Sequence, residues 1–326
     1  MKPIRIGING FGRIGRIAAR IASTRESIVL AAINSRADSN SHAYLLTHDS
    51  THGTFAHPVT SGDGYIEVKN QKVLCFQSSS PDQIPWQEAN VDLVIETSGK
   101  FTTQESAAKH LTAGVKKVVI SAPSDDCDKT IVMGVNDSEY NRTQHQVVSN
   151  ASCTTNCTAV VAKVLDDAFG IKHAMMTTVH AATQSQKILD GASLKDPRGG
   201  RSVLNNIIPS TTGASKAVVQ VLPQLSGKLS ALSLRVPVTD GSIIDFVAEV
   251  EKPATVESVN KAFEEATQGV LSNVLGVTTH ELVSSDIIGT AYSALIDTKL
   301  TAVQGTNLVK VLAWYDNEWG YATRLV

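Results

Sequence analysis

The stretch Ile4-Arg5-Ile6-Gly7-Ile8-Asn9-Gly10-Phe11-Gly12-Arg13-Ile14-Gly15 joins a short apolar strand pattern to a glycine-rich turn. Its glycines 10, 12 and 15 form the pattern G-x-G-x-x-G, and a helix-like stretch follows over residues 16–23. In a dinucleotide-binding turn, these glycines allow a tight bend, a close approach of the backbone to a pyrophosphate, and close packing of the helix on the strand. A similar turn can join a strand to a helix without binding a ligand. A second strand pattern at 28–33, at the required spacing, favours the binding role.

The rest of the chain divides into two patterns. Up to about residue 150, short β-branched runs alternate with helix-like stretches, which is typical of a parallel sheet with crossover helices. After residue 153, a helix pattern is followed by longer and more alternating strands. We therefore predict an α/β protein with a Rossmann NAD(P)-binding domain over 1–152 and an α+β catalytic domain over 153–316, the latter with a mainly antiparallel sheet. A C-terminal helix over 317–326 is expected to return to the first domain.

The end of the second strand bears on the choice of cofactor. A site specific for NAD places a carboxylate there to bind the ribose 2′-hydroxyl, whereas this chain reads Asn34-Ser35-Arg36. A hydroxyl beside a guanidinium is suited to a 2′-phosphate, although Arg36 is also explained as a solvated loop residue. The sequence predicts that either NAD or NADP binds, and that NADP is used at least as well as NAD.

The segment Ser149-Asn150-Ala151-Ser152-Cys153-Thr154-Thr155-Asn156-Cys157 follows a strand and begins a helix. A thiol at a helix N-terminus is a candidate nucleophile, because the exposed N–H groups and the helix dipole favour its thiolate. Ser152 and Thr154 are also explained as helix-capping residues. One Cys-x-x-x-Cys spacing without an accompanying His or Cys pair does not indicate a metal or a disulfide, so Cys157 is expected to be buried and no metal site is expected.

Two polar residues lie in otherwise apolar strands. His180 ends the run 175–179 and is either a base or a satisfied core histidine. Arg235 lies in the run 232–238, where an arginine needs an anionic partner, either a carboxylate or a phosphate.

Composition excludes several classes of protein. The chain has 326 residues, 29 Lys+Arg against 31 Asp+Glu, and a net charge of −2, so nucleic acid is not expected as a partner. Its longest apolar runs have the length of strands, so no membrane association is expected. The N-terminus enters a strand pattern directly, and we expect a cytoplasmic protein. The segment 185–206 has no clear period and is interpreted as a long ordered loop or an oligomer contact.

Several further motifs resemble the phosphorylating glyceraldehyde-3-phosphate dehydrogenases. The resemblance covers almost the whole chain, in the order GINGFGRIGR at 7–16, HDSTHG at 48–53, SNASCTTNC at 149–157, TTVHAATQ at 177–184, PSTTGASKAV at 209–218, LRVPV at 234–238 and WYDNEWGY at 314–321. It implies that Cys153 is the nucleophile and His180 the base, and that the aldehyde is oxidised through a hemithioacetal and a thioester that inorganic phosphate then attacks. The family is a homotetramer, with a neighbour's loop corresponding to about 184–206.

The resemblance also implies the binding residues. The phosphate of the sugar phosphate would bind to Thr183 and Arg235, and the attacking phosphate to Ser152, Thr154, Thr212 and Gly213. The cofactor would contact Gly10, Gly12, Arg13, Ile14, Asn34, Ser35, Arg36, Ser121 and Asn317.

Two other functions stay open at this level. Erythrose-4-phosphate dehydrogenase is one, because Ala182 stands where the commoner pattern has a tyrosine. The other is a non-catalytic nucleotide-binding paralogue, against which the intact set Cys153, His180 and Arg235 argues.

Overall fold

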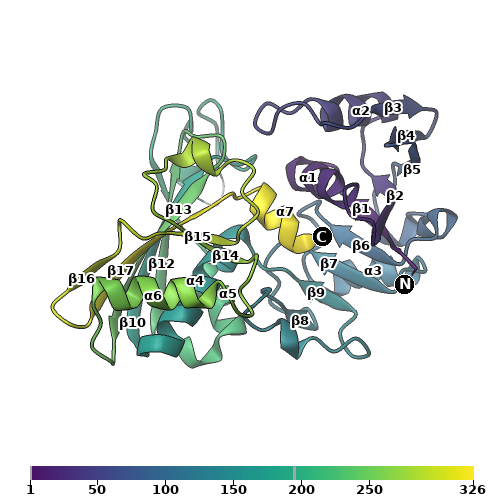
Figure 1. The fold of residues 1–326 in the computed structure, drawn as a ribbon. Helices are drawn as coiled ribbons and strands as arrows, with labels where there is room; N and C mark the ends of the chain where they lie inside the picture. Colours follow the sequence, from purple (N-terminus) through teal and green to yellow (C-terminus); the bar gives the residue numbers. More distant parts are fainter. Residues whose placement is uncertain (1, 194–195) are drawn as a thin grey trace. The chain divides into compact units, whose positions relative to one another are not determined.

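The computed structural model describes residues 2–193 and 196–326, and this part of the chain forms two compact units. The first unit consists of residues up to Ile131, Ser138–Ala151 and Ala322–Val326, and the second of Val132–Asp137 and Ser152–Tyr321. Figure 1 shows the sheet of each unit, coloured along the sequence. The predicted α/β class, with a sheet in each part, is confirmed. The predicted domain boundaries at 152/153 and 316/317 stay a prediction.

The first unit contains a nine-stranded sheet in the order β3-β4-β5-β2-β1-β6-β7-β9-β8. The strands β5-β2-β1-β6-β7-β9-β8 pair in parallel, as predicted from the short apolar runs. The strands β3-β4-β5 form an antiparallel meander, which was not predicted from the sequence. The strands are β1 (Ile4–Asn9), β2 (Ile28–Asn34), β3 (Val59–Gly62), β4 (Tyr65–Val68), β5 (Gln71–Phe76), β6 (Leu93–Glu96), β7 (Lys117–Ile120), β8 (Lys129–Thr130) and β9 (Val147–Ser149).

Three α-helices accompany this sheet. They are α1 (Arg13–Ala22), α2 (Ser39–Thr47) and α3 (Gln104–Thr112), with 3₁₀ turns at Pro81–Gln83, Trp86–Ala89 and Asp137–Glu139. Helix α1 begins at Arg13 with Gly12 as its N-cap, three residues before the predicted start, so the last part of the glycine motif is itself helical. The first N–H groups of α1 therefore lie within the motif, where they are available to an anion.

A buried polar network ties together the carboxyl ends of β2, β1 and β6. The Asn34 amide donates to Asn9 Oδ1 (2.8 Å), and the Asn9 amide donates to Glu96 Oε2 (2.5 Å). Glu96 also contacts His110 Nε2 (3.0 Å), whose Nδ1 accepts from Trp86 Nε1 (3.1 Å). Because all five side chains are buried, the network fixes the strand ends from which the glycine turn departs.

The second unit contains an eight-stranded mixed sheet in the order β11-β12-β10-β13-β17-β15-β14, with β16 paired to β17. Most of its pairs are antiparallel, as predicted, and β10–β12 and β14–β15 are parallel. The strands are β10 (Ile171–Ala181), β11 (Ile208–Ser210), β12 (Leu229–Val236), β13 (Ser242–Val250), β14 (Leu275–Thr278), β15 (Ala294–Asp297), β16 (Ala302–Gln304) and β17 (Leu308–Tyr315).

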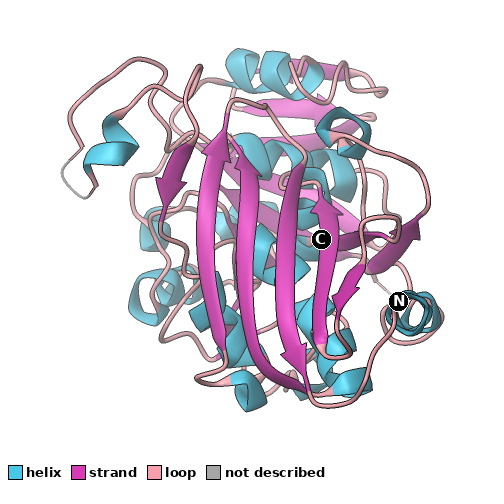
Figure 2. Ribbon diagram, turned by 90° about the vertical axis from the view of Figure 1, so that its left-hand side faces the viewer, coloured by secondary structure: helices cyan, strands magenta, loops and turns pink. Residues whose placement is uncertain are grey.

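The α-helices of the second unit pack on one face of its sheet. They are α4 (Cys153–Phe169), α5 (Ala214–Val221) and α6 (Val256–Ala266), with 3₁₀ turns at Pro197–Gly200, Pro223–Leu225 and Ser284–Ile287. The last helix, α7 (Trp319–Leu325), is shorter than the predicted 317–326 and runs from the second unit into the tail that belongs to the first. Figure 2 shows the opposite face of the sheet, where the long strands have no helix in front of them.

None of the helices in the described residues is both long enough and apolar enough to cross a bilayer.

Candidate active site

Cys153 is the first residue of α4, as predicted. Ser152 is the N-cap residue, and its hydroxyl accepts from the Thr155 N–H (3.0 Å), so this serine has the capping role that the sequence allowed. The peptide before it bends sharply, because Ala151 adopts φ +54°. Cys153 Sγ lies 3.4 Å from His180 Nε2, a contact distance between a candidate nucleophile and a candidate base. The predicted burial of Cys157, one turn further along α4, is confirmed.

His180 and Arg235 are direct neighbours because β10 and β12 run parallel with these two residues in register. Arg235 Nη1 lies 2.7 Å from His180 Nδ1 and 3.3 Å from the Ala181 carbonyl oxygen. The same carbonyl lies 2.8 Å from His180 Nδ1. Among the described residues, the hydrogen-bond partners of the Arg235 guanidinium are thus the His180 ring and a backbone carbonyl, and not a carboxylate.

Burial and charge keep the thiol and the imidazole neutral in this arrangement. Burial, together with the positive charge of Arg235, lowers the pKa of His180 to about 3. Burial raises the pKa of the Cys153 thiol, although the Arg235 charge acts in the opposite direction. The expected preference for a thiolate at the helix N-terminus is therefore outweighed here by desolvation.

Tyr315 is a buried residue of the site to which the sequence analysis gave no role. Its hydroxyl contacts Thr154 Oγ1 (2.9 Å) and Thr178 Oγ1 (2.8 Å), and its ring packs edge-on against His180 at a centroid distance of 5.9 Å. The alternation of Met176, Thr178 and His180 on the buried side of β10 could have indicated such a residue, because a buried threonine hydroxyl needs a hydrogen-bond partner. The Thr154 hydroxyl therefore faces the protein interior.

The other predicted phosphate-binding residues lie at two places. Thr183 follows β10 and is exposed, with its hydroxyl bonded to Ser185 and Gln186. Thr212 and Gly213 precede α5, and Gly213 is an exposed N-cap residue without a side-chain cap. The Thr212 hydroxyl accepts from the Ala214 N–H (3.2 Å), so Thr212 rather than Gly213 supplies a side-chain contact at the start of α5.

The glycine motif has the geometry that a pyrophosphate requires. Gly10 has φ +94°, and a Cβ atom on Gly15 would lie 2.1 Å from the Gly10 carbonyl oxygen. A Cβ atom on Gly12 would meet nothing within 4 Å, so the absence of a side chain there leaves the backbone open to a ligand. The residues present thus fit a dinucleotide.

Arg13, predicted to lie under the pyrophosphate, is paired with Asp49 at 2.5 Å. Burial would raise the pKa of the Asp49 carboxyl, but hydrogen bonds from Arg13 and from the His52 and Thr51 N–H groups lower it to about 2. Asp49 therefore stays ionised and holds the Arg13 side chain, while Ile14 is half-buried in the first turn of α1.

The remaining predicted cofactor residues of the first unit lie at the carboxyl ends of strands. Asn34 is buried and bonded to Asn9 and Ser78, so its side chain supports the strand end. Ser35 continues from β2, with its N–H bonded to Phe76, and Arg36 is exposed. Ser121 follows β7 and donates its N–H to the Glu96 carbonyl.

Asn317, in the second unit, is held by a residue that the sequence analysis missed. The Ser242 hydroxyl donates to Asn317 Oδ1 (2.6 Å) and accepts from the Ala181 N–H (3.0 Å). Ser242 therefore links the Asn317 amide to the backbone of Ala181, the residue after His180.

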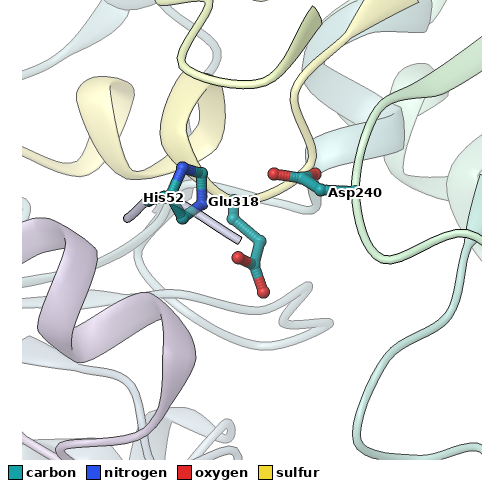
Figure 3. A group of neighbouring side chains, drawn as sticks. All are labelled: His52, Asp240 and Glu318. Carbon is teal, nitrogen blue, oxygen red and sulfur yellow. The ribbon is translucent and has the colours of Figure 1, made fainter. Parts of the chain in front are cut away.

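Next to this amide lies a buried pair of carboxyl groups, Asp240 and Asp316. Asp316 accepts three backbone N–H groups, from Gly289, Glu318 and Trp319. Asp240 is hydrogen-bonded to Asp316, and burial followed by the charges of Asp316 and Glu318 raises the pKa of Asp240 well above its usual range. Figure 3 draws Asp240 and Glu318, together with His52 of the first unit. We infer that Asp240 is protonated at neutral pH and donates to Asp316.

We expect Asp240→Asn to stabilise the protein at alkaline pH. A carboxyl group whose pKa is raised in the folded state contributes stability at low pH. This stability is lost as the pH rises above the pKa that the group has in the unfolded chain. An amide can donate to Asp316 without this loss, so the thermal midpoint of the variant should fall less between pH 6 and pH 9. At pH 8 the gain should be about 1–3 kcal/mol.

The matched control is Asp245→Asn, which alters a half-buried carboxylate of β13 that is paired with Lys310 of β17. This control should leave the pH dependence of the midpoint unchanged. Equal slopes for wild type and Asp240→Asn would contradict the carboxyl-pair interpretation.

Comparison with known proteins agrees with this geometry. Residues 4–104 match the family model of the glyceraldehyde 3-phosphate dehydrogenase NAD binding domain, and residues 152–317 match that of the C-terminal domain. The chain is 47% identical over 334 residues to a cytosolic glyceraldehyde-3-phosphate dehydrogenase of Sinapis alba, covering 100% of this chain and 96% of that protein. It is also 47% identical to glyceraldehyde-3-phosphate dehydrogenase 2 of Nostoc sp., over 99% of this chain and 96% of the relative, and to glyceraldehyde-3-phosphate dehydrogenase 1 of Bacillus cereus, with the same coverage. With both of its parts matched and almost its full length shared with these relatives, the chain belongs to the glyceraldehyde-3-phosphate dehydrogenase family.

Proposed function

We propose that the protein is a phosphorylating glyceraldehyde-3-phosphate dehydrogenase with Cys153 as nucleophile and His180 as base. The observation that carries this proposal is the 3.4 Å contact between Cys153 Sγ and His180 Nε2 at the start of α4. The relatives named above are glyceraldehyde-3-phosphate dehydrogenases, and the glycine motif fits a dinucleotide. Neither erythrose-4-phosphate dehydrogenase nor a non-catalytic role gains support from them.

In the proposed reaction, Cys153 Sγ bonds to the aldehyde carbon of the sugar phosphate and yields a hemithioacetal. His180 takes the proton of the hemithioacetal hydroxyl as the carbon is oxidised to the thioester level. When bound, the nicotinamide dinucleotide accepts the hydride. Inorganic phosphate then attacks the thioester, the bond to Cys153 Sγ breaks, and an acyl phosphate leaves. The Cys153 N–H and the His180 imidazole are the donors available to the oxyanion.

Two sets of residues would hold the two phosphates. For the sugar phosphate we propose Arg235 and Thr183, because Arg235 is half-buried and its Nε has no partner among the described residues. For the attacking phosphate we propose Ser152, Thr212 and Gly213 with the backbone of Thr154. The exposed position of Gly213 at the start of α5 supports the latter set, because the N-terminus of a helix favours an anion.

The test is reduction of the cofactor by D-glyceraldehyde 3-phosphate with and without inorganic phosphate. With phosphate we expect continuous turnover, and without it at most about one reduction per active site, because the thioester accumulates. Erythrose 4-phosphate should be the poorer substrate in kcat/KM. Turnover that does not depend on phosphate would refute the phosphorylating mechanism.

We also propose that NADP is used at least as well as NAD. Ser35 and Arg36 present a hydroxyl and an exposed guanidinium at the end of β2, where NAD-specific sites have a carboxylate. The nearby Asp38 does not supply one, because its carboxylate caps α2 by accepting from the Ser41 N–H (2.8 Å).

Arg36→Ala should therefore weaken NADP binding selectively, by about tenfold to a hundredfold, because a charge-assisted contact is lost. Ser35→Asp should shift the preference towards NAD, because a carboxylate repels the 2′-phosphate. Both effects are measured as kcat/KM for the two cofactors. A strong preference of the wild type for NAD, with Arg36→Ala affecting both cofactors alike, would contradict the proposal.

The bare face of the second sheet supports a homotetramer, in which another copy of this chain covers it. Its strands place mostly apolar side chains on that face, with Met175 73% exposed and Leu232 45% exposed. The loop 185–206, of which residues 194–195 lie outside the described part, adds exposed Ile188, Leu189 and Leu204. Such an apolar surface is typical of a subunit interface.

Light scattering at micromolar concentration should give a tetramer for the wild type. Leu232→Glu should reduce the number of subunits in the oligomer, because it places a charge on the bare face. Val270→Glu, which changes an apolar residue that is still more exposed and lies outside that face, should not. A monomeric wild type would rule out this assembly.

A further inference from the structure

The loop 48–53, between α2 and β3, carries the sequence HDSTHG and takes no part in the proposed reaction. Its two ends lie together, because the Phe55 N–H donates to the Thr47 carbonyl (2.7 Å). Gly53 adopts φ +68°, a conformation that favours glycine. A loop that is closed at its base and bent at a glycine has a defined shape, so its side chains can position a neighbouring group.

Arg20 of α1 holds this loop from the interior of the first unit. It is 3% exposed, its Nε donates to the Leu46 carbonyl (3.0 Å), and its Nη2 donates to the carbonyls of Thr47 (3.2 Å) and Gly53 (3.1 Å). The guanidinium also lies over the Phe55 ring, 5.2 Å from its centroid. Because a buried arginine here donates to three carbonyls, it fixes the end of α2 and the loop relative to α1.

Asp49 connects the loop to the glycine turn. Its Oδ1 accepts from the Thr51 (2.9 Å) and His52 (3.0 Å) N–H groups within the loop, and its Oδ2 accepts from Arg13 Nη1 (2.5 Å). Arg13 is the first residue of α1 and follows Gly12, whose backbone is open to a ligand. The Asp49 side chain is 2% exposed and that of Arg13 is 25% exposed, so the guanidinium is the part of the pair that a ligand can reach.

We propose that Arg20 and Asp49 are positioning residues for the dinucleotide: Arg20 holds the loop 48–53, and Asp49 of this loop orients the Arg13 guanidinium towards the pyrophosphate. Orienting this long side chain in advance removes part of the entropy that binding would otherwise cost. The proposal rests on the proposed function only in assigning a dinucleotide to the glycine motif. It differs from a charge effect, because the Asp49 carboxylate by itself repels a phosphate.

The first experiment measures the equilibrium binding of ADP and of adenosine to the full-length protein. Asp49→Asn keeps an oxygen for the Thr51 and His52 N–H groups, so the loop stays closed, but its amide nitrogen cannot accept from Arg13. We expect ADP to bind about tenfold more weakly, because an oriented charge-assisted contact is lost, and adenosine to bind as to the wild type. If Asp49 acted only through its negative charge, the variant would bind ADP more tightly, which would overturn the proposal.

The second experiment is a double-mutant cycle for ADP binding. Arg13→Ala should weaken ADP binding, and adding Asp49→Asn should have no further effect, because no guanidinium remains to be oriented. Arg20→Met should weaken ADP binding as Asp49→Asn does, and combining the two should be no worse than either alone. Additive effects of Asp49→Asn and Arg13→Ala would overturn the proposal, because a merely structural role of Asp49 does not act through Arg13.

The first unit offers a matched control for each positioning residue. Asp92→Asn alters a carboxylate that also accepts a backbone N–H, from Arg5 (3.2 Å), and also pairs with a cation, Lys116 (2.7 Å). Arg5→Met removes an arginine that also donates to a backbone carbonyl, that of Ala89. Both controls lie at the edge of the sheet opposite the glycine turn, because β1 and β6 are parallel, and both should bind ADP as the wild type does.

The remaining outcomes are also decisive. If Arg20→Met does not fold, the cycle of Asp49→Asn with Arg13→Ala still tests the inference. A wild type that binds ADP no better than adenosine would show that the glycine motif does not hold a pyrophosphate, and would overturn the inference. A protein that shows the expected coupling but does not turn over D-glyceraldehyde 3-phosphate would refute the proposed function and leave this inference intact.

Discussion

Cys153→Ser should lower kcat by about a thousandfold or more while leaving cofactor binding close to that of the wild type. Burial already raises the pKa of the thiol at this position, and a serine hydroxyl is far harder to ionise. The His180 base, neutral at pH 7, cannot compensate for that difference. Steady-state turnover and a cofactor titration measure the two effects separately.

Cys127→Ser is the control, since Cys127 is a half-buried thiol of the first unit whose Sγ lies 3.8 Å from the Thr130 hydroxyl. It should retain activity. Iodoacetamide should inactivate the enzyme by labelling Cys153 first, because Cys153 Sγ has a base, His180 Nε2, at 3.4 Å, and Cys157 is buried in α4. Near-normal activity of the Cys153→Ser variant, or prior labelling of another cysteine, would assign the nucleophile elsewhere.

Gly15→Ala should impair both folding stability and cofactor binding. The added methyl group would lie 2.1 Å from the Gly10 carbonyl oxygen and 3.0 Å from Thr97 Oγ1. Since the nearest atom is backbone, α1 has to move away from β1, at a cost of about 1–3 kcal/mol. We expect a lower thermal midpoint and a dissociation constant for the dinucleotide at least tenfold higher, measured by calorimetry.

Gly12→Ala separates these two effects. Its methyl group would meet no protein atom within 4 Å, and the backbone at Gly12 (φ −80°, ψ −156°) is accessible to alanine. Stability should therefore be unchanged, while the dinucleotide loses affinity because the methyl group occupies the space of the pyrophosphate. A Gly12→Ala variant that binds the cofactor normally would show that the pyrophosphate does not approach this glycine.

The parts of the fold that the sequence predicted are those that depend on local pattern. The strand, glycine turn and helix at residues 4–22 and the helix beginning at Cys153 follow from neighbouring residues along the chain. The antiparallel hairpin β3–β4 was missed, because its strands have four residues each and a mixed polar pattern.

The unpredicted features of the candidate site depend on register between distant strands. The contact between His180 and Arg235 requires the parallel alignment of β10 with β12, which neither strand specifies alone. The pairing of Asp240 with Asp316 joins residues that precede β13 and follow β17. A polar residue in an apolar strand indicates that a buried partner exists, but its identity comes from the topology.

The position of β17 in its sheet has a consequence for the order of folding during synthesis. All strands of the first sheet lie within residues 4–149, so that sheet can form while the ribosome is still translating the rest. In the second sheet, β17 (308–315) lies between β13 and β15, although it is the last strand to be made. Until it leaves the ribosome, β13 has an unpaired edge. We expect the half-made second unit to be the species that binds chaperones and aggregates when translation is slowed.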